Sequence, residues 1–228
     1  MKENKHEQLV TALCDPDNLC AYKATYDNIE IGLIPRFLGK CLVFTGTLLY
    51  GDKPTYGKFK SIEVIARIPY QSWEVMSYML LTACYSNEKK AIELAKTSEF
   101  SRTAQDNETM HVVVLAQLAK RYDQDTFLLH TFVPLVFSFF YFFASAVLYL
   151  FSPRSALELN YLFEKHAYEQ YDRFIEENAE DLKKKPVMIE YLNFYGRNVI
   201  SEYELFRSIR NDELAHRNQS AERASEYV

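Results

Sequence analysis

Two short motifs in the chain combine residue types that bind metal ions. Glu108 and His111 form one Glu-x-x-His, and Glu213 and His216 form another. Residues three positions apart on a helix share a face, so each motif directs a carboxylate and an imidazole toward one point. Two such motifs, with one Glu from each of two further helices, are the ligand set of di-metal carboxylate helix bundles. The spacing therefore predicts a centre of two metal ions.

The lone partners of these motifs are predicted to be Glu63 and Glu164. All four Glu residues fall on the apolar side of a helical pattern, where an ionised carboxylate is costly unless it is paired or bound to metal. Carboxylate oxygens with one imidazole per metal suit iron or manganese better than ions that prefer thiolates. The alternative is a set of buried ion pairs, but few Lys and Arg lie on those faces.

A third copy of the motif, Glu3 with His6, lies in the polar N-terminus. It has no apolar stripe behind it, and short motifs occur by chance, so we interpret this copy as accidental. Asn107 and Asp212 each directly precede a predicted ligand Glu, and Asp212 could accept a hydrogen bond from a ligand imidazole. Plain polar positions on a helix surface would look the same in the sequence.

The elements that must position these residues are helices. With only 6 Gly and 7 Pro in 228 residues, an all-α chain is favoured over an all-β or disordered one. The fold class is predicted to be a ferritin-like four-helix di-iron bundle with additional membrane-associated helices. We expect a polar, loosely ordered arm over 1–29, one bundle domain over 30–222 and a tail over 223–228. Helices are expected over 31–50, 55–84, 98–122, 126–151, 154–178, 187–195 and 198–222. The pattern leaves open whether the helix over 98–122 extends back through 88–97.

The composition limits the classes of partner that the protein is expected to bind. A net charge of −5 without a strongly basic stretch gives no electrostatic basis for nucleic-acid binding. The four Cys lack the spacing of a zinc site and are expected to be reduced thiols. The 17 Tyr and 16 Phe suit a core, an apolar ligand site or a membrane interface.

Residues 126–151 contain no Asp, Glu, Lys or Arg and exceed the about 20 residues needed to span a bilayer. A single crossing there would separate the predicted ligands before it from those after it, so they could not share one metal pair. We therefore expect a monotopic protein, attached to one leaflet by residues 31–50 and part of 126–151. A core helix is an equally good interpretation of 31–50.

Four ordered segments resemble one known family, the alternative oxidases, and within it the plastid terminal oxidase (plastoquinol oxidase) branch. Residues 61–70 (SIEVIARIPY) resemble its LETxARxPY stretch, and 107–111 (NETMH) resemble its NExxH. Residues 163–167 (FEKHA), followed by Tyr171, resemble its EAHA segment, and 210–216 (RNDELAH) resemble its RxDExxH end motif. The order and rough spacing match from about residue 52 to 218. Leu157 stands where the mitochondrial branch has His.

The resemblance implies a non-haem di-iron quinol oxidase that is monotopic and often dimeric. It would oxidise plastoquinol or ubiquinol and reduce O₂ to water, without proton pumping. Position by position, the resemblance implies two Fe ions with Tyr171 as a redox-active residue. It also implies a quinol site near Lys58, Ile62 and His166, where Lys58 replaces the usual Arg. The implied iron ligands are Glu63, Glu108, His111, Glu164, Glu213 and His216.

Two other functions share the same ligand pattern. A di-iron hydroxylase of quinone rings would insert oxygen into the ring, and a non-catalytic ferritin-like bundle would only bind metal. The aromatic, apolar segments disfavour the latter, because a soluble storage subunit should not carry them. The expected location is a thylakoid or cytoplasmic membrane of a photosynthetic prokaryote, of its virus or of a plastid. The expected partners are quinol, O₂, lipid of one leaflet and a second copy in a homodimer, with no nucleic acid.

Overall fold

The computed structural model describes residues 5–227. No β-strand occurs among them, and a lone bridge joins Pro186 and Ser201. The all-α class predicted from the sequence is therefore confirmed. The described chain divides into two compact units, residues 55–156 and the two chain ends, 1–54 with 157–228. A single domain over 30–222 stays a prediction.

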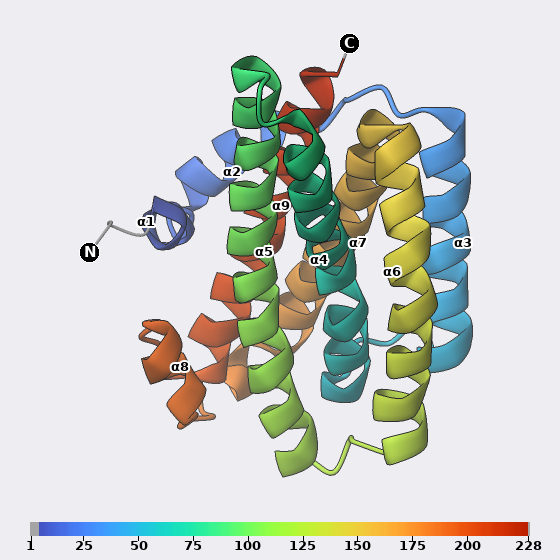
Figure 1. The fold of residues 1–228 in the computed structure, drawn as a ribbon. Coiled ribbons are helices and arrows are strands. Elements are labelled where there is room, and N and C mark those ends of the chain that lie inside the picture. The colour runs from blue at the N-terminus through green and yellow to red at the C-terminus, as the bar shows by residue number, and fades with distance from the viewer. Residues whose placement is uncertain (1–4, 228) are drawn as a thin grey trace. The chain divides into compact units, whose positions relative to one another are not determined.

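The middle unit consists of α4 (Tyr56–Cys84), α5 (Glu88–Arg121) and α6 (Val133–Phe151), with a short π-helix, η1 (Leu128–Phe132), before α6. Both α5 and α6 pack along α4 (Figure 1). The Thr55 and Asn87 side chains cap α4 and α5 by accepting from Lys58 N and Lys90 N, which satisfies backbone donors of the first turns. Helix α5 includes residues 88–97, the extension that the sequence left open, because the Asn87 cap and Glu88 in its first turn favour an early start.

The core of this unit follows the apolar stripes. On α4 the buried side chains include Phe59, Ala66 and Tyr70, and the Tyr70 ring meets Phe100 of α5 edge to face at 5.6 Å. Ser72 of α4 donates to Ser145 of α6, Oγ to Oγ, at 3.0 Å. These contacts fix α4 in register with α5 and α6. The buried stripe of α4 carries Glu63, and that of α5 carries Glu108 and His111.

The unit of the two chain ends contains α1 (Lys5–Ala12), α2 (Pro16–Ala24), α3 (Leu33–Tyr50), most of α7 (Pro153–Leu182), α8 (Glu190–Tyr195) and α9 (Glu202–Ser225). Phe206 of α9 packs between Tyr171 and Phe174 of α7, with ring centroids 6.1 and 4.8 Å away. Asn160 of α7 donates to Ser220 Oγ of α9 at 3.1 Å. These contacts set α7 against α9.

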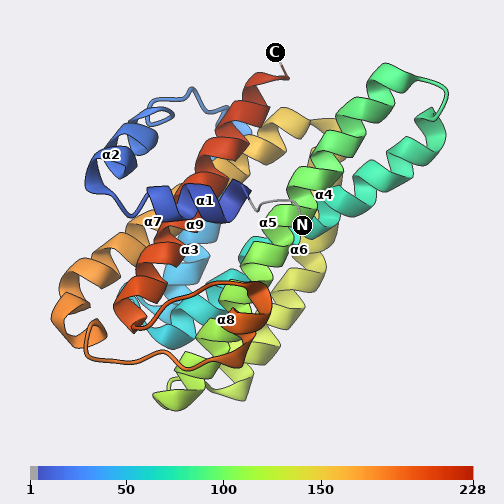
Figure 2. The same ribbon diagram turned by 90° about the vertical axis from the view of Figure 1, so that its left-hand side faces the viewer.

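The N-terminal arm differs from the prediction of a loose segment. It forms two helices, and α1 and α2 both contact α9 (Figure 2). Asp15 caps α2 by accepting from Asp17 N and Asn18 N, and Pro16 opens the helix where no amide hydrogen is needed. His6, Val10 and Leu13 are buried. The arm is ordered because α9 supplies partners that its own sequence does not contain.

Two helical segments are long and apolar enough to cross a membrane, Leu33–Tyr50 and Leu128–Phe151. Both keep large apolar side chains exposed. On α3 these include Phe37, Phe44 and Leu48, and on α6 they include Phe139 and Phe143. Length and composition alone therefore agree with the two predicted membrane-associated segments.

Candidate metal centre

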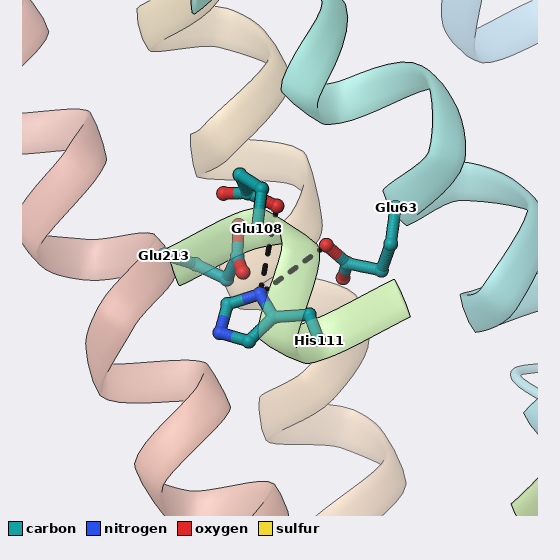
Figure 3. A group of neighbouring side chains, drawn as sticks. All are labelled: Glu63, Glu108, His111 and Glu213. Carbon is teal, nitrogen blue, oxygen red and sulfur yellow. Dashed lines mark hydrogen bonds and ion pairs between the residues drawn. The ribbon is translucent and has the colours of Figure 1, made fainter. Parts of the chain in front are cut away.

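The middle unit brings three predicted ligands together, here called the first triad: Glu63 of α4 with Glu108 and His111 of α5. Figure 3 shows dashed lines from one ring nitrogen of His111 to the carboxylates of Glu63 and Glu108. His111 Nδ1 lies 3.3 Å from Glu63 Oε2 and 3.5 Å from Glu108 Oε2. One ligand atom from each residue lies within 4.8 Å of the others, and all three side chains are buried. Oxygen and imidazole donors thus converge away from water.

The electrostatics of the first triad favour a cation. Burial, and then the neighbouring charge of Glu108, raise the pKa of Glu63 from 4.5 to about 7, while the hydrogen bond with His111 acts in the opposite direction. Two carboxylates this close in a buried site resist being ionised together. A bound metal ion removes that conflict, because it supplies positive charge where both oxygens point.

The unit of the chain ends holds an equivalent set, the second triad: Glu164 of α7 with Glu213 and His216 of α9. Its ligand atoms also lie within 4.8 Å of one another, and the three residues are buried. Each triad therefore repeats one composition, a lone Glu from one helix and a Glu-x-x-His from another. The structure places all six predicted ligands in this two-by-three pattern.

Sequence reasoning missed a residue that touches the second triad. Asn160 Nδ2 donates to Glu164 Oε1 at 3.0 Å, one helical turn before it on α7, and both residues are buried. The same amide donates to Ser220 Oγ. The signal was present in the sequence, because an Asn four residues before a predicted ligand Glu shares its helix face. Asn160 thus holds one carboxylate oxygen in place.

The residues preceding the two ligand Glu residues are buried rather than surface polar groups. Asn107 and Asp212 are both fully buried. Asp212 accepts from His6 Nε2 at 2.8 Å and from Arg197 Nη2 at 3.0 Å through Oδ1, and its Oδ2 accepts from Arg197 Nη1. Although burial disfavours its charged form, Asp212 and Glu7 raise the pKa of Arg197. Asp212 thus accepts from an arginine and from a histidine outside the six predicted ligands, and its role as an acceptor for a ligand imidazole stays a prediction.

Tyr171 lies on α7 seven residues after Glu164, two helical turns along the same face. It is buried, and its ring packs on Phe206 of α9. The structure therefore puts the phenol on the side of α7 that carries the second triad.

The three predicted quinol residues divide between the units. His166 lines a cavity of about 460 Å³ between α3 and α7, with Arg36, Phe44 and Phe163 among its other lining residues. Lys58 and Ile62 lie on α4 in the middle unit, where Lys58 is buried and Ile62 is partly buried. The structure thus associates a cavity of ligand size with His166.

One known family matches most of the chain. Residues 28–225 match the family described as Alternative oxidase. The chain belongs to the alternative oxidase family. It is also similar to a ubiquinol oxidase of Arabidopsis thaliana, described as ubiquinol oxidase 4, chloroplastic/chromoplastic, with 27% identity over 188 residues. The match covers 74% of this chain and 50% of that relative, so the chain spans about half the relative's length.

Membership of the alternative oxidases confirms the resemblance seen in the sequence and the fold class of a di-iron helical bundle. The donor sets of the two triads fit such a centre, since each offers two carboxylates and one imidazole in a buried position. Both triads can therefore hold metal.

Proposed function

We propose that this chain is a quinol:oxygen oxidoreductase that couples oxidation of two quinols to reduction of one O₂ to two waters. The observation that carries the proposal is the pair of buried Glu₂His triads in a chain of the alternative oxidase family. Reduction of O₂ to two waters takes four electrons, and each quinol gives two. Two iron ions, when bound, would supply the redox exchange between quinol and oxygen.

We further propose that the first triad holds one metal ion and the second triad holds another. The proposed ligands are Glu63, Glu108 and His111 in the first, and Glu164, Glu213 and His216 in the second. The chain's residues have distinct tasks around the metal. Metal uptake requires Glu63 to release the proton that burial and Glu108 let it keep near neutral pH. On the other triad, the Asn160 amide fixes one oxygen of Glu164. Burial keeps water away from both sets of ligands.

The quinol is proposed to approach from lipid toward His166. The cavity beside His166 is lined by apolar side chains of α3 and α7 and also by the charged Arg36 and Lys40 of α3. Its volume of about 460 Å³ suits a ring-sized ligand. The exposed apolar face of α3 makes this a route from a membrane. Tyr171, on the same helix as His166, would pass a proton and an electron from its phenol during oxygen reduction. Lys58 and Ile62 are proposed to contribute from α4.

A monotopic attachment fits these residues best. Predicted ligands lie on both sides of α6 in the sequence, so a single crossing by that segment would separate them by a bilayer. We propose that α3 and α6 rest on one leaflet through their exposed apolar faces, and that the working unit is a homodimer. The name of the Arabidopsis relative, a chloroplastic/chromoplastic ubiquinol oxidase, supports a plastid location and a quinol substrate. We propose plastoquinol as that substrate, with ubiquinol as the alternative.

Oxygen uptake by the purified, iron-loaded protein with a short-chain plastoquinol tests the reaction. We expect two quinols consumed per O₂, no inhibition by cyanide and the quinone as the only organic product. A ring-hydroxylated quinone would instead establish the monooxygenase. Iron binding without quinol-dependent oxygen uptake would establish the non-catalytic bundle.

Iron analysis of Glu108→Ala and Glu213→Ala tests the metal ligands, one from each triad. Both variants should bind less iron per chain than the wild type. Glu99→Ala and Glu222→Ala are the matched controls, because these exposed residues lie on the same two helices, α5 and α9. Unchanged iron content in both ligand variants would contradict the proposed centre.

A further inference from the structure

The N-terminal strap, residues 5–27, is fastened to α9 through its backbone. Side chains of α9 donate to four of its carbonyls: Asn211 to Val10, Arg207 to Cys14, Asn218 to Tyr22 and Arg217 to Lys23, over 2.5 to 3.1 Å. Figure 2 shows α1 and α2 lying against α9. The helix that carries Glu213 and His216 therefore has the strap packed along it.

Two strap residues reach further than these carbonyl contacts. His6 is buried, and its Nε2 lies 2.8 Å from Asp212 Oδ1. Because an ionised carboxylate can only accept, Nε2 is the donor. Glu7 accepts from Arg197 Nη2 at 2.5 Å and from Arg197 Nε at 3.2 Å. The strap thus closes a chain of contacts from His6 through Asp212 and Arg197 to Glu7.

His6 also touches a predicted ligand directly. Its ring stacks on that of His216, with centroids 5.5 Å apart and planes inclined by 22°. Asp212, its hydrogen-bond partner, immediately precedes Glu213. One side chain from the start of the sequence therefore constrains both ligands that α9 contributes to the second triad.

We propose that His6 is a positioning residue of the second triad, which fixes the ring plane of His216 by stacking and the backbone at Glu213 through Asp212. This inference rests on the proposed metal centre. Groups behind metal ligands orient them, and their removal typically weakens metal binding by about 10- to 100-fold.

A separate metal site at His6, Glu7 and Asp212 is the competing explanation, since their ligand atoms lie within 4.8 Å of one another. The guanidinium of Arg197 already occupies the position of the cation there, because it donates to both carboxylates. A metal ion would have to displace this buried cation. The cluster is therefore a support for α9 and not a third ion site.

Cobalt(II) titration of the metal-free full-length protein tests the inference, with visible absorption and the rate of metal transfer to a chelator as readouts. His6→Ala should weaken binding of one of the two ions by about 10-fold or more and alter the cobalt absorption bands. His6→Gln, which keeps a donor near Nε2, should recover most of the affinity. His6→Phe, which keeps a ring but no donor, should recover less.

Two controls separate positioning from loosening of the strap. Gln8→Ala changes an exposed residue of α1, and Arg207→Ala releases the strap at the Cys14 carbonyl without touching His6. Both should stay within about twofold of the wild type, well below the change expected from loss of a support. A loss in Arg207→Ala equal to that in His6→Ala, or wild-type behaviour of His6→Phe, would overturn the assignment.

The outcomes also separate this inference from the proposed function. If the wild type fails to bind two cobalt ions per chain, the metal centre itself is refuted. If the wild type binds two ions and His6→Ala binds them equally tightly with unchanged spectra, only the role of His6 is refuted. Should His6→Ala not fold, the comparison of His6→Gln with His6→Phe decides, since both fill the site.

Discussion

The metal-free protein should become more stable when Glu63 is replaced by Gln. Glu63 is buried beside Glu108, and these two causes, burial first, raise its pKa to about 7. A Gln has the same shape, can still face His111 Nδ1, and carries no charge to bury. Ligand sites commonly lower the stability of a protein when the ligand is absent. Glu63→Gln should therefore bind metal less tightly and, without metal, be more stable than the wild type.

The magnitude follows from the two pKa values. In the unfolded chain Glu63 ionises near 4.5, and in the folded chain near 7. Below pH 4.5 both states are protonated and the carboxylate costs nothing. As the pH rises toward 7 the unfolded state loses its proton first, so the stability of the wild type falls, and above pH 7 the full penalty of about 3 kcal/mol is present.

Urea unfolding of chelator-treated protein at pH 5 and pH 8, followed by circular dichroism, measures the effect. The free energy of unfolding of Glu63→Gln should exceed that of the wild type by about 3 kcal/mol at pH 8, and by much less at pH 5. Glu99→Gln, an exposed change on α5, should show no such difference. If Glu63→Gln is no more stable than the wild type at pH 8, the buried carboxylate of Glu63 does not destabilise the folded protein.

Three further outcomes are expected. Gly57→Ala should destabilise the protein by about 1–3 kcal/mol in thermal unfolding, because its Cβ would lie 2.2 Å from the carbonyl oxygen of Gln124, whereas Gly46→Ala, with open space around it, should be neutral or slightly stabilising. Asn160→Ala should cost about 1.5–3 kcal/mol in urea unfolding, since it removes a hydrogen bond to a carboxylate; no change would mean that the bond is not formed in solution. Tyr171→Phe should keep the iron content and lower quinol-dependent oxygen uptake by roughly 100-fold, and full activity would remove the phenol from the mechanism.

The two triads were predictable because their signals are local. Glu-x-x-His spacing places Glu108 with His111 on one helix face, and the apolar stripe around Glu63 shows which face is buried. Helix periodicity also located the long helices to within a few residues, except where the Asn87 cap extended α5. What could be read from a window of about two helical turns was largely present in the structure.

The strap was not predictable in this way. His6 and Asp212 are separated by 206 positions, and the polar pattern around His6 gave no sign of burial. The reason for the order of the strap is visible only in the structure, where Arg217 and Asn218 of α9 are almost fully buried. Buried groups of this kind require acceptors, and the carbonyls of the strap supply them. Glu3 lies outside the described residues, so the interpretation of the Glu3 copy as accidental stays a prediction, while its His6 is a buried residue hydrogen-bonded to Asp212.

The union of both chain ends in one unit has a consequence for biosynthesis. The described residues of 1–54 pack in one unit with those of 157–227, and α9 is the last of the described helices to be translated. At about 5–20 residues per second, the strap waits on the order of 10–40 s after its own synthesis before its partner exists. During that interval the apolar α3 is available to a membrane or a chaperone, while the second triad still lacks Glu213 and His216. Under the proposed function, the second triad is therefore complete only once α9 has been translated, whereas the first triad is encoded within residues 55–156.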